Sequence, residues 1–222
     1  MKKYFPILIN SPLFKNIKES ELSGMLECLQ AVEKSYCKNS DIFIAGQRAL
    51  YVGIICAGRV QVVKDDVMGN RSIQANLSTG DIFGETFACA GIDILPVSVV
   101  AREDTDVLLL DYRRIMDSCG SACGFHNRMI ENMLRIMAEK NLFLNRKLDI
   151  ASARSTREKI MKYLLYYAGE KGSLVFDIPL NRQELADYLS VDRSAMSAEL
   201  GRMRDEGLIE FDKSRFELLG KT

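Results

Sequence analysis

Histidine is nearly absent from this 222-residue chain, because His126 is the only one. A single imidazole offers little general-base chemistry. No Ser–His–Asp, Cys–His or phosphate-binding glycine-loop arrangement accompanies it. We therefore expect a protein that is not an enzyme.

The chain also has no net charge, since 30 Lys and Arg are balanced by 30 Asp and Glu. From Ser152 onward, acidic and basic side chains are again equal in number. This balance argues against a protein that coats polyanions without regard to sequence. It is compatible with a local basic edge that reads DNA.

Long apolar runs are missing as well. The N-terminal stretch MKKYFPILIN is interrupted by Pro6 and does not fit a signal peptide, and no run is long enough to cross a bilayer. We expect a cytoplasmic protein with no membrane contact and with reduced thiols. Cys119 and Cys123 stand four apart, but no other cysteine pair or histidine cluster joins them. Buried or half-buried thiols therefore account for the six cysteines better than a zinc or iron–sulfur site.

Two patterns organise the first half of the chain. Between Ser11 and Leu29, short helices are predicted, with one apolar face made of Leu22, Met25, Leu26 and Leu29. From about Ala31 to Asp111, short β-rich runs alternate with turn residues at Gly46, Gly58, Gly69-Asn70 and Gly80-Asp81. Many short antiparallel strands at this spacing predict a jelly roll, whose interior is either filled or holds a small ligand.

A long helix with two apolar stripes is predicted from about Phe125 to Ala151. One stripe, with Met129, Met133 and Ile136, is enough for packing on the strand domain. We expect the other, a four–three heptad, to meet the same helix of a second subunit in a parallel coiled coil. The expected dimer contacts are Ile130, Leu134, Met137, Asn141, Leu144 and Leu148. The alternative is a single helix buried on both sides within one chain.

After a hinge at Ser152–Arg154, a helix is predicted at Thr156–Gly169, with Ile160, Leu164, Leu165 and Tyr167 available for a small core. The next segment predicts two helices joined by a tight turn, with Asn181 and Asp192 as their N-caps. The buried face of the pair is formed by Leu185, Ala186, Leu189, Met196, Leu200 and Met203. The alternating segment LIEFDKSRFELLG follows and predicts a hairpin, which completes the plan of a winged helix-turn-helix. An ordinary helical hairpin is the alternative when the helix pair is considered alone.

Four segments, SPLFKNIKESEL, GRVQVVKDD, GDIFGE and SVDRSAMSAELGRMRDEGLI, resemble in this order the Crp–Fnr family of bacterial transcription regulators. The resemblance covers nearly the whole chain and implies an α+β fold. It implies an antiparallel β-roll sensor at residues 1–124, a dimerisation helix and hinge at 125–152, and a winged helix-turn-helix at 153–222. It also implies a homodimer that binds a palindromic double-stranded operator, responds to a small effector, and controls access of RNA polymerase.

The resemblance implies which residues touch DNA. Arg182, Gln183 and Arg193 match family positions that contact phosphates or base edges, and Ser194 and Ser197 match base-reading positions. Arg202 lies on the same outer face of the second helix, by its helical spacing. The family often has an arginine where this chain has Ala198, so a different operator is expected.

The effector site departs further from the family. Gly84-Glu85 keeps the family's Gly–Glu pair, but Leu95 and Pro96 stand where cyclic-nucleotide binders have an arginine and a serine for the phosphate. We therefore expect an unidentified, smaller or less charged effector in place of cAMP. The expected contacts are Gly84, Glu85, Thr86, Val97, Ser98, Asn141, Leu144 and Asn145. The alternative is a filled roll in which Glu85 only caps a turn.

Other sensors and another function class have less support. The family's iron–sulfur branch uses an N-terminal cysteine cluster, and no cysteine precedes Cys28. Haem would depend on His126, which we expect at a helix edge or in solvent. Haem is kept as a minor alternative. The second function hypothesis, motivated by the even charge after Ser152, is a ligand- or redox-sensing module whose winged helix contacts proteins.

Overall fold

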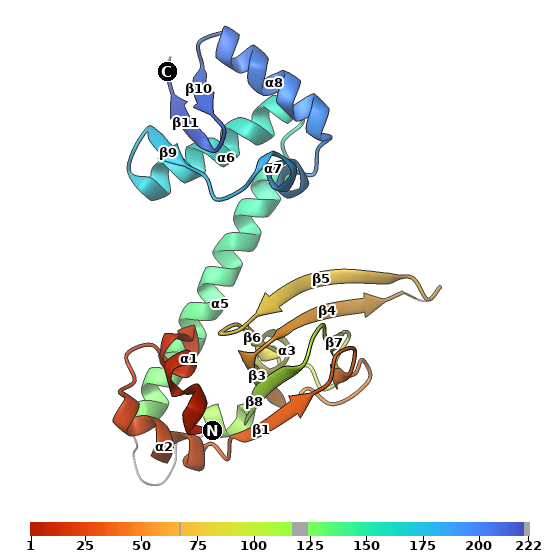
Figure 1. The fold of residues 1–222 in the computed structure, drawn as a ribbon, viewed down its shortest axis with the longest axis vertical. Helices are drawn as coiled ribbons and strands as arrows, with labels where there is room; N and C mark the ends of the chain where they lie inside the picture. Colours follow the sequence, from red (N-terminus) through yellow and green to blue (C-terminus); the bar gives the residue numbers. More distant parts are fainter. Residues whose placement is uncertain (67, 117–123, 220–222) are drawn as a thin grey trace. The chain divides into compact units, whose positions relative to one another are not determined.

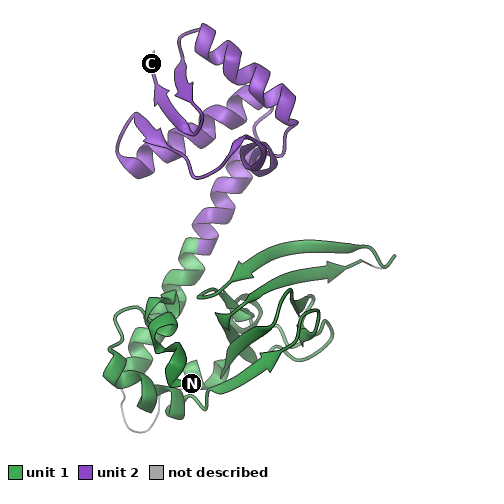
Figure 2. Cartoon of the chain, viewed as in Figure 1, with its two compact units in different colours: residues 1–139 green, residues 140–222 purple. Residues whose placement is uncertain are grey.

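The computed structural model of the protein describes residues 1–66, 68–116 and 124–219. The chain divides into two compact units, residues 1–139 and residues 140–222 (Figure 2). The division falls within the helix α5 (Gly124–Ala151). The three functional segments expected from the sequence, with boundaries after residues 124 and 152, remain a prediction.

The first unit is built on two four-stranded sheets (Figure 1). Their strand orders are β1-β8-β3-β6 and β2-β7-β4-β5, and the strands described pair antiparallel. This arrangement confirms the predicted antiparallel β-roll. The strands are β1 (Val32–Tyr36), β2 (Asp41–Phe43), β3 (Tyr51–Ala57), β4 (Arg59–Asp65), β5 (Arg71–Ser78), β6 (Ile82–Phe83), β7 (Ser98–Ala101) and β8 (Thr105–Asp111).

The turn between β3 and β4 illustrates why glycine occupies the turns of the roll. Gly58 has a φ of +92°, and a Cβ there would lie 2.6 Å from Thr105 Oγ1 and 2.7 Å from the carbonyl oxygen of Asp104. Both the left-handed backbone and the lack of space exclude a larger side chain. The turn predicted from the sequence is therefore confirmed here on steric grounds.

Short helices complete the first unit, and several were not predicted individually. They are η1 (Lys2–Tyr4), α1 (Phe5–Asn10), η2 (Pro12–Phe14), α2 (Glu19–Cys28), α3 (Glu85–Cys89) and α4 (Tyr112–Met116). The sequence interpretation treated Pro6 as an interruption. In the structure it occupies the first turn of α1, where a missing N–H costs nothing.

Two clusters of buried side chains stabilise the first unit. One joins the N-terminal helices, the β3–β8 sheet and the first half of α5, and it includes the expected α2 face as well as Met129, Met133 and Ile136. The other fills the roll between its sheets and contains Phe43, Phe83, Leu95, Val99 and Leu109. Apolar side chains therefore occupy the interior of the roll around Leu95.

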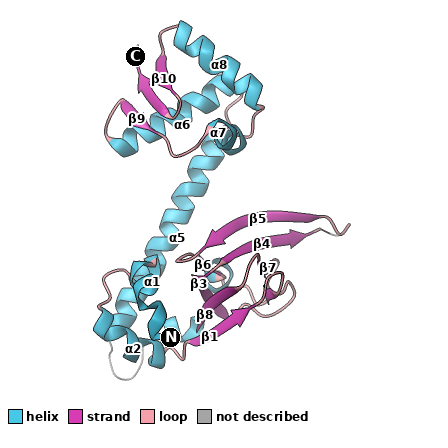
Figure 3. Cartoon of the chain, in the orientation of Figure 1, coloured by secondary structure: helices cyan, strands magenta, loops and turns pink. Residues whose placement is uncertain are grey.

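The second unit contains the end of α5, three further helices and a three-stranded antiparallel sheet of order β10-β11-β9 (Figure 3). The elements are α6 (Thr156–Lys171), β9 (Val175–Asp177), α7 (Arg182–Leu189), α8 (Arg193–Asp205), β10 (Ile209–Asp212) and β11 (Arg215–Leu218). The predicted winged helix-turn-helix, with its β-hairpin wing, is confirmed.

One predicted core residue of α6 is wrong. Leu165 is 55% exposed, whereas Tyr163 is buried together with Ile160 and Leu164. Adjacent helical residues differ by about 100° in direction, so Leu164 and Leu165 cannot both face the same core. Tyr163 lies three residues after Ile160 and therefore shares its face.

Candidate nucleic-acid interface

Both helices of the helix-turn-helix begin at the predicted caps. The Asn181 side chain accepts hydrogen bonds from the backbone N–H groups of Gln183 and Glu184, and the Glu184 carboxylate accepts one from the Asn181 N–H. Asp192 accepts a bond from the Ala195 N–H at the start of α8. The turn residue Ser190 has a φ of +52°. These local bonds fix where α7 and α8 begin.

One face of α8 is anchored and the opposite face is free. Met196, Leu200 and Met203 are at most 1% exposed and pack in the core of the second unit. Side chains on the other face lie in solvent, and these are Arg193, Ser194, Ser197, Ala198 and Arg202. Small side chains at 194, 197 and 198 let the backbone of α8 approach a groove closely.

The polar side chains on this face differ in whether they already form hydrogen bonds within the protein. The Ser194 hydroxyl donates to Asp192 Oδ1 at 2.5 Å, and Arg202 Nη1 donates to Glu199 Oε2 at 2.9 Å. Within the part of the chain that the structure describes, the side chains of Arg193 and Ser197 have no hydrogen-bond partner. These two side chains therefore reach a ligand without breaking an existing bond.

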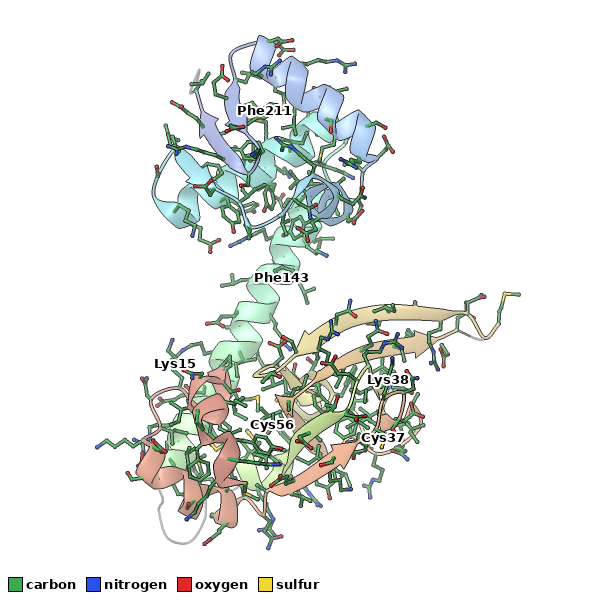
Figure 4. All side chains as sticks on the ribbon, in the orientation of Figure 1. Lys15, Cys37, Lys38, Cys56, Phe143 and Phe211 are labelled. Carbon is green, nitrogen blue, oxygen red and sulfur yellow. The ribbon has the colours of Figure 1, made fainter. Side chains whose placement is uncertain are left out.

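Arg182 and Gln183, at the start of α7, are less available. The Arg182 guanidinium lies 4.8 Å from the ring centroid of Phe211 and 5.0 Å from that of Phe216, both on the wing; Phe211 is labelled in Figure 4. Burial lowers the pKa of Arg182. Gln183 Nε2 donates to Asp187 Oδ1 at 2.9 Å. Arg182 thus ties α7 to the wing, whatever else it contacts.

A surface depression of about 390 Å³ lies beside the same helix start. Its lining includes Asn181, Arg182 and the wing-turn residues Lys213 and Ser214. Lys213 was not predicted as a site residue, and its φ of +50° places it at the tip of the β10–β11 turn. The depression gathers two cationic side chains around a helix N-terminus, which is a favourable setting for a phosphate.

In the first unit, the expected effector residues lie in two segments: Gly84, Glu85 and Thr86 form the start of α3, and Val97 and Ser98 lie where β7 begins. Gly84 has a φ of +81° and precedes Glu85, which is 2% exposed and accepts a hydrogen bond from Thr86 Oγ1 at 3.0 Å. Val97 is buried, and Ser98 Oγ accepts a bond from the Ala45 N–H at 2.9 Å.

The residues that replace the family's arginine and serine have separate environments. Leu95 is 4% exposed within the apolar roll interior, and Pro96 is exposed. The position that would carry the phosphate-binding cation is therefore a core position here.

The other three expected effector residues belong to the second unit. Asn141, Leu144 and Asn145 are exposed, and Asn145 Nδ2 donates to Asn141 Oδ1 at 3.1 Å along the helix. The two amides share this one hydrogen bond, and the neighbouring Leu144 side chain is uncovered.

The heptad stripe of α5 is largely exposed. Leu134, Leu144 and Leu148 are 65%, 61% and 68% exposed, while Ile130 and Met137 are half-buried. The neighbouring stripe of Met129, Met133 and Ile136 is at most 6% exposed. The two stripes therefore differ sharply: one is covered by its own chain and the other is not.

Comparison with known proteins decides the family. Residues 158–220 match a Crp-like helix-turn-helix domain, and residues 33–121 match a cyclic nucleotide-binding domain. Together the two matches span about two thirds of the chain. The chain belongs to the Crp–Fnr family. It is a DNA-binding transcription regulator of the Crp type.

Relatives of this Crp–Fnr regulator extend over most of its length. A cyclic AMP receptor protein of Thermus thermophilus is 23% identical over 211 residues, which cover 94% of this chain and 92% of that protein. The transcriptional activator protein FnrL of Cereibacter sphaeroides is 24% identical over 196 residues, covering 82% and 74%. The crystal structure of the Thermus thermophilus catabolite activator protein matches with a TM-score of 0.55 at 22% identity, covering 94% and 93%. That last likeness shows a shared fold.

His126 and Cys37 are placed differently from expectation, whereas Cys28, Cys56 and Cys89 are buried or half-buried as expected. His126 was expected at a helix edge or in solvent, but it is 4% exposed, with its ring 4.7 Å from that of Phe125. Cys119 and Cys123 lie outside the described residues. Burial raises the pKa of the Cys56 thiol to about 12, whereas Cys37 is exposed.

None of the helices in the described ranges is long and apolar enough to span a bilayer. Within the same ranges, no three His, Cys, Asp or Glu side chains cluster as metal ligands would.

Proposed function

We propose that the protein is a homodimeric, effector-responsive regulator that binds a two-fold symmetric operator with one α8 helix in each major groove. The observation that carries this proposal is the anchored α8 with its free outer face. Arg193 and Ser197 on that face have no partner among the described side chains, and small residues beside them permit close approach. An arginine that forks onto guanine supplies about 1–3 kcal/mol of preference.

The exposed heptad stripe of α5 supports the dimer. Leu134, Leu144 and Leu148 are each more than 60% exposed, and a row of such leucines is costly to leave in water. The same stripe of a second subunit would cover it by knobs-into-holes packing. A two-fold axis then relates the two α8 helices, which read half-sites about 34 Å apart.

The surroundings of Leu95 support an effector other than cAMP. One relative is named a cyclic AMP receptor protein, but this chain offers no arginine for the cyclic phosphate at position 95. The Leu95 side chain is instead part of the apolar interior of the roll. We expect titration calorimetry of the full-length protein with cAMP to give no saturable heat, and saturable binding would contradict this part of the proposal.

Selection of binding sites from random-sequence DNA tests the operator proposal. The expected product is an inverted repeat whose half-sites are about 10–11 base pairs apart, centre to centre. Footprinting of the chain's own upstream region should then give symmetric protection. If selection returned no inverted repeat, the winged helix would instead serve protein contacts.

Arg193→Ala tests the role of α8 directly. We expect specific affinity to fall by roughly 10-fold, since a contact of about 1–3 kcal/mol is lost, while the dimer stays folded. Arg48→Ala, which removes the same charge from an exposed position in the first unit, is the control. Unchanged affinity of the Arg193→Ala variant would refute the assignment of α8.

A further inference from the structure

Arg157, in the first turn of α6, binds two carboxylates of the recognition-helix segment. Its Nε donates to Glu199 Oε1 at 2.5 Å. Its Nη1 and Nη2 donate to the two carboxylate oxygens of Glu206, each at 2.7 Å. The bidentate pair with Glu206 and the third hydrogen bond, to Glu199, hold the guanidinium in one plane and one position.

The two glutamates occupy different positions along α8. Glu199 belongs to its middle, and Glu206 caps its C-terminal end. Their backbone positions are seven residues apart, about 10 Å along the helix axis, and both side chains converge on the one guanidinium. A helix held at two such points by one rigid side chain can neither tilt nor rotate freely against α6, because either motion breaks at least one pair.

The Glu199 carboxylate connects this clamp to the exposed face of α8. Its side chain is 13% exposed and receives Arg202 Nη1 on its other oxygen at 2.9 Å. Arg157 and Arg202 therefore share one half-buried carboxylate. Both cations also lower the pKa of Glu199, Arg157 more strongly, so the carboxylate stays charged.

We infer that Arg157 is a positioning residue for DNA recognition, acting through Glu199 and Glu206 rather than by touching DNA. It fixes the orientation of α8 against α6. It also neutralises the Glu199 carboxylate, which would otherwise repel nearby phosphates. Glu199, so neutralised, holds the Arg202 guanidinium in one orientation. This inference rests on the proposed role of α8 in reading the operator.

The geometry also argues against a direct contact between Arg157 and phosphate. Three of its five N–H groups already donate to carboxylates. Exchanging these bonds for a phosphate would release two negative side chains next to the DNA backbone, which would offset the gain.

Arg157→Met in the full-length protein tests the inference, with Arg154→Met as the control. Arg154 lies three residues earlier, is exposed, and among the described residues its side chain forms no ion pair. Affinities for the selected operator and for a scrambled duplex are measured at several salt concentrations. We expect about 10-fold weaker operator binding, a fall of about 1.4 kcal/mol. Scrambled-duplex affinity should fall less than operator affinity, because only the unpaired carboxylates weaken it, and the salt slope should stay nearly unchanged. The control should change neither the operator affinity nor the specificity ratio.

A direct phosphate contact predicts a different result. Arg157→Met would then weaken both duplexes alike and reduce the salt slope by about one, which would overturn the inference. Adding Glu199→Gln and Glu206→Gln to Arg157→Met should recover most of the operator affinity if the lost neutralisation is the cause. Failure to recover any affinity would contradict the electrostatic part.

Two further variants distinguish a variant that does not fold, a wrong inference about Arg157 and a wrong proposed function. If Arg157→Met does not fold, Arg157→Lys keeps the charge but cannot make the forked contact, and a lower specificity ratio is again expected. Unchanged specificity in Arg157→Lys would then overturn the inference. Arg193→Ala reports on α8 itself: if it abolishes operator binding while the Arg157 variants do not, only the inference fails. If the wild-type protein has no specific operator, the proposed function and the inference fail together.

Discussion

We predict that alanine at position 84 destabilises the protein for two reasons, the positive φ and the lack of space for a Cβ. Comparison of Gly84→Ala with Gly46→Ala separates the two contributions. The φ of Gly84 is +81°, and a Cβ would lie 2.7 Å from the carbonyl oxygen of Tyr51 and 2.9 Å from the ring of Phe43. Gly46 has a similar φ of +91°, but a Cβ there would meet nothing within 4 Å. Gly46→Ala therefore carries the backbone penalty alone, and Gly84→Ala carries the penalty and the overlap.

The expected magnitudes follow from these two contributions. A left-handed backbone costs a residue with a Cβ about 1–2 kcal/mol, so Gly46→Ala should destabilise the first unit by that amount. Overlap in a packed site adds about 1–3 kcal/mol, because backbone at Tyr51 cannot move as a flexible side chain could. Gly84→Ala should therefore cost about 2–5 kcal/mol.

Hydrogen exchange of the full-length protein measures both variants without assuming a single unfolding transition. The amides of β3 and β8 report opening of the first unit, and those of α6 and α8 serve as an internal reference. Equal losses of protection in both variants would refute the steric argument. An unaltered β3 in Gly84→Ala would refute the placement of this glycine against Tyr51.

Three further predictions concern other parts of the chain. Leu144→Lys should shift the protein toward monomer in sedimentation analysis, because a charge would enter the proposed coiled coil; Leu165→Lys, at a similarly exposed leucine on α6, should not. Iodoacetamide at pH 8 should modify Cys37 and spare Cys56 until urea is added, because burial raises the pKa of Cys56 to about 12 and leaves almost no thiolate; labelling of the native Cys56 would contradict its burial. Arg182→Lys should lower the thermal stability of the second unit by about 1 kcal/mol without any DNA present, because the stacked guanidinium is lost; a residue that only contacts DNA would leave the free protein unchanged.

The helix-turn-helix was predictable because its signals are local. Asn181 and Asp192 bond to N–H groups two or three residues away, so residue type and spacing reveal them. The apolar period of α8 likewise predicts which side is buried. The roll was predictable from its turns, but β1 carries little strand signal of its own, since its sequence VEKSY is mostly polar and largely exposed.

Contacts that join distant parts of the chain could not be predicted. Arg157 lies 42 residues from Glu199 and 49 from Glu206, and nothing in the local sequence of α6 marks it. The burial of His126 depends on packing around the start of α5. Helical spacing predicted that Ser194 and Arg202 are exposed, but it could not show that both already hold partners on their own helix.

The buried amide of Asn132 has a consequence for how the chain is made. Its Nδ2 donates to the carbonyl oxygens of Leu13 and Lys15, 119 and 117 residues earlier, and its neighbours Met129, Met133 and Ile136 share a core with the N-terminal helices. During synthesis, the N-terminal helices emerge from the ribosome long before these partners exist. Their apolar faces cannot be fully covered until the first half of α5 has been translated, so the first unit completes its fold late. The N-terminal helices are thus made long before they can be fully buried.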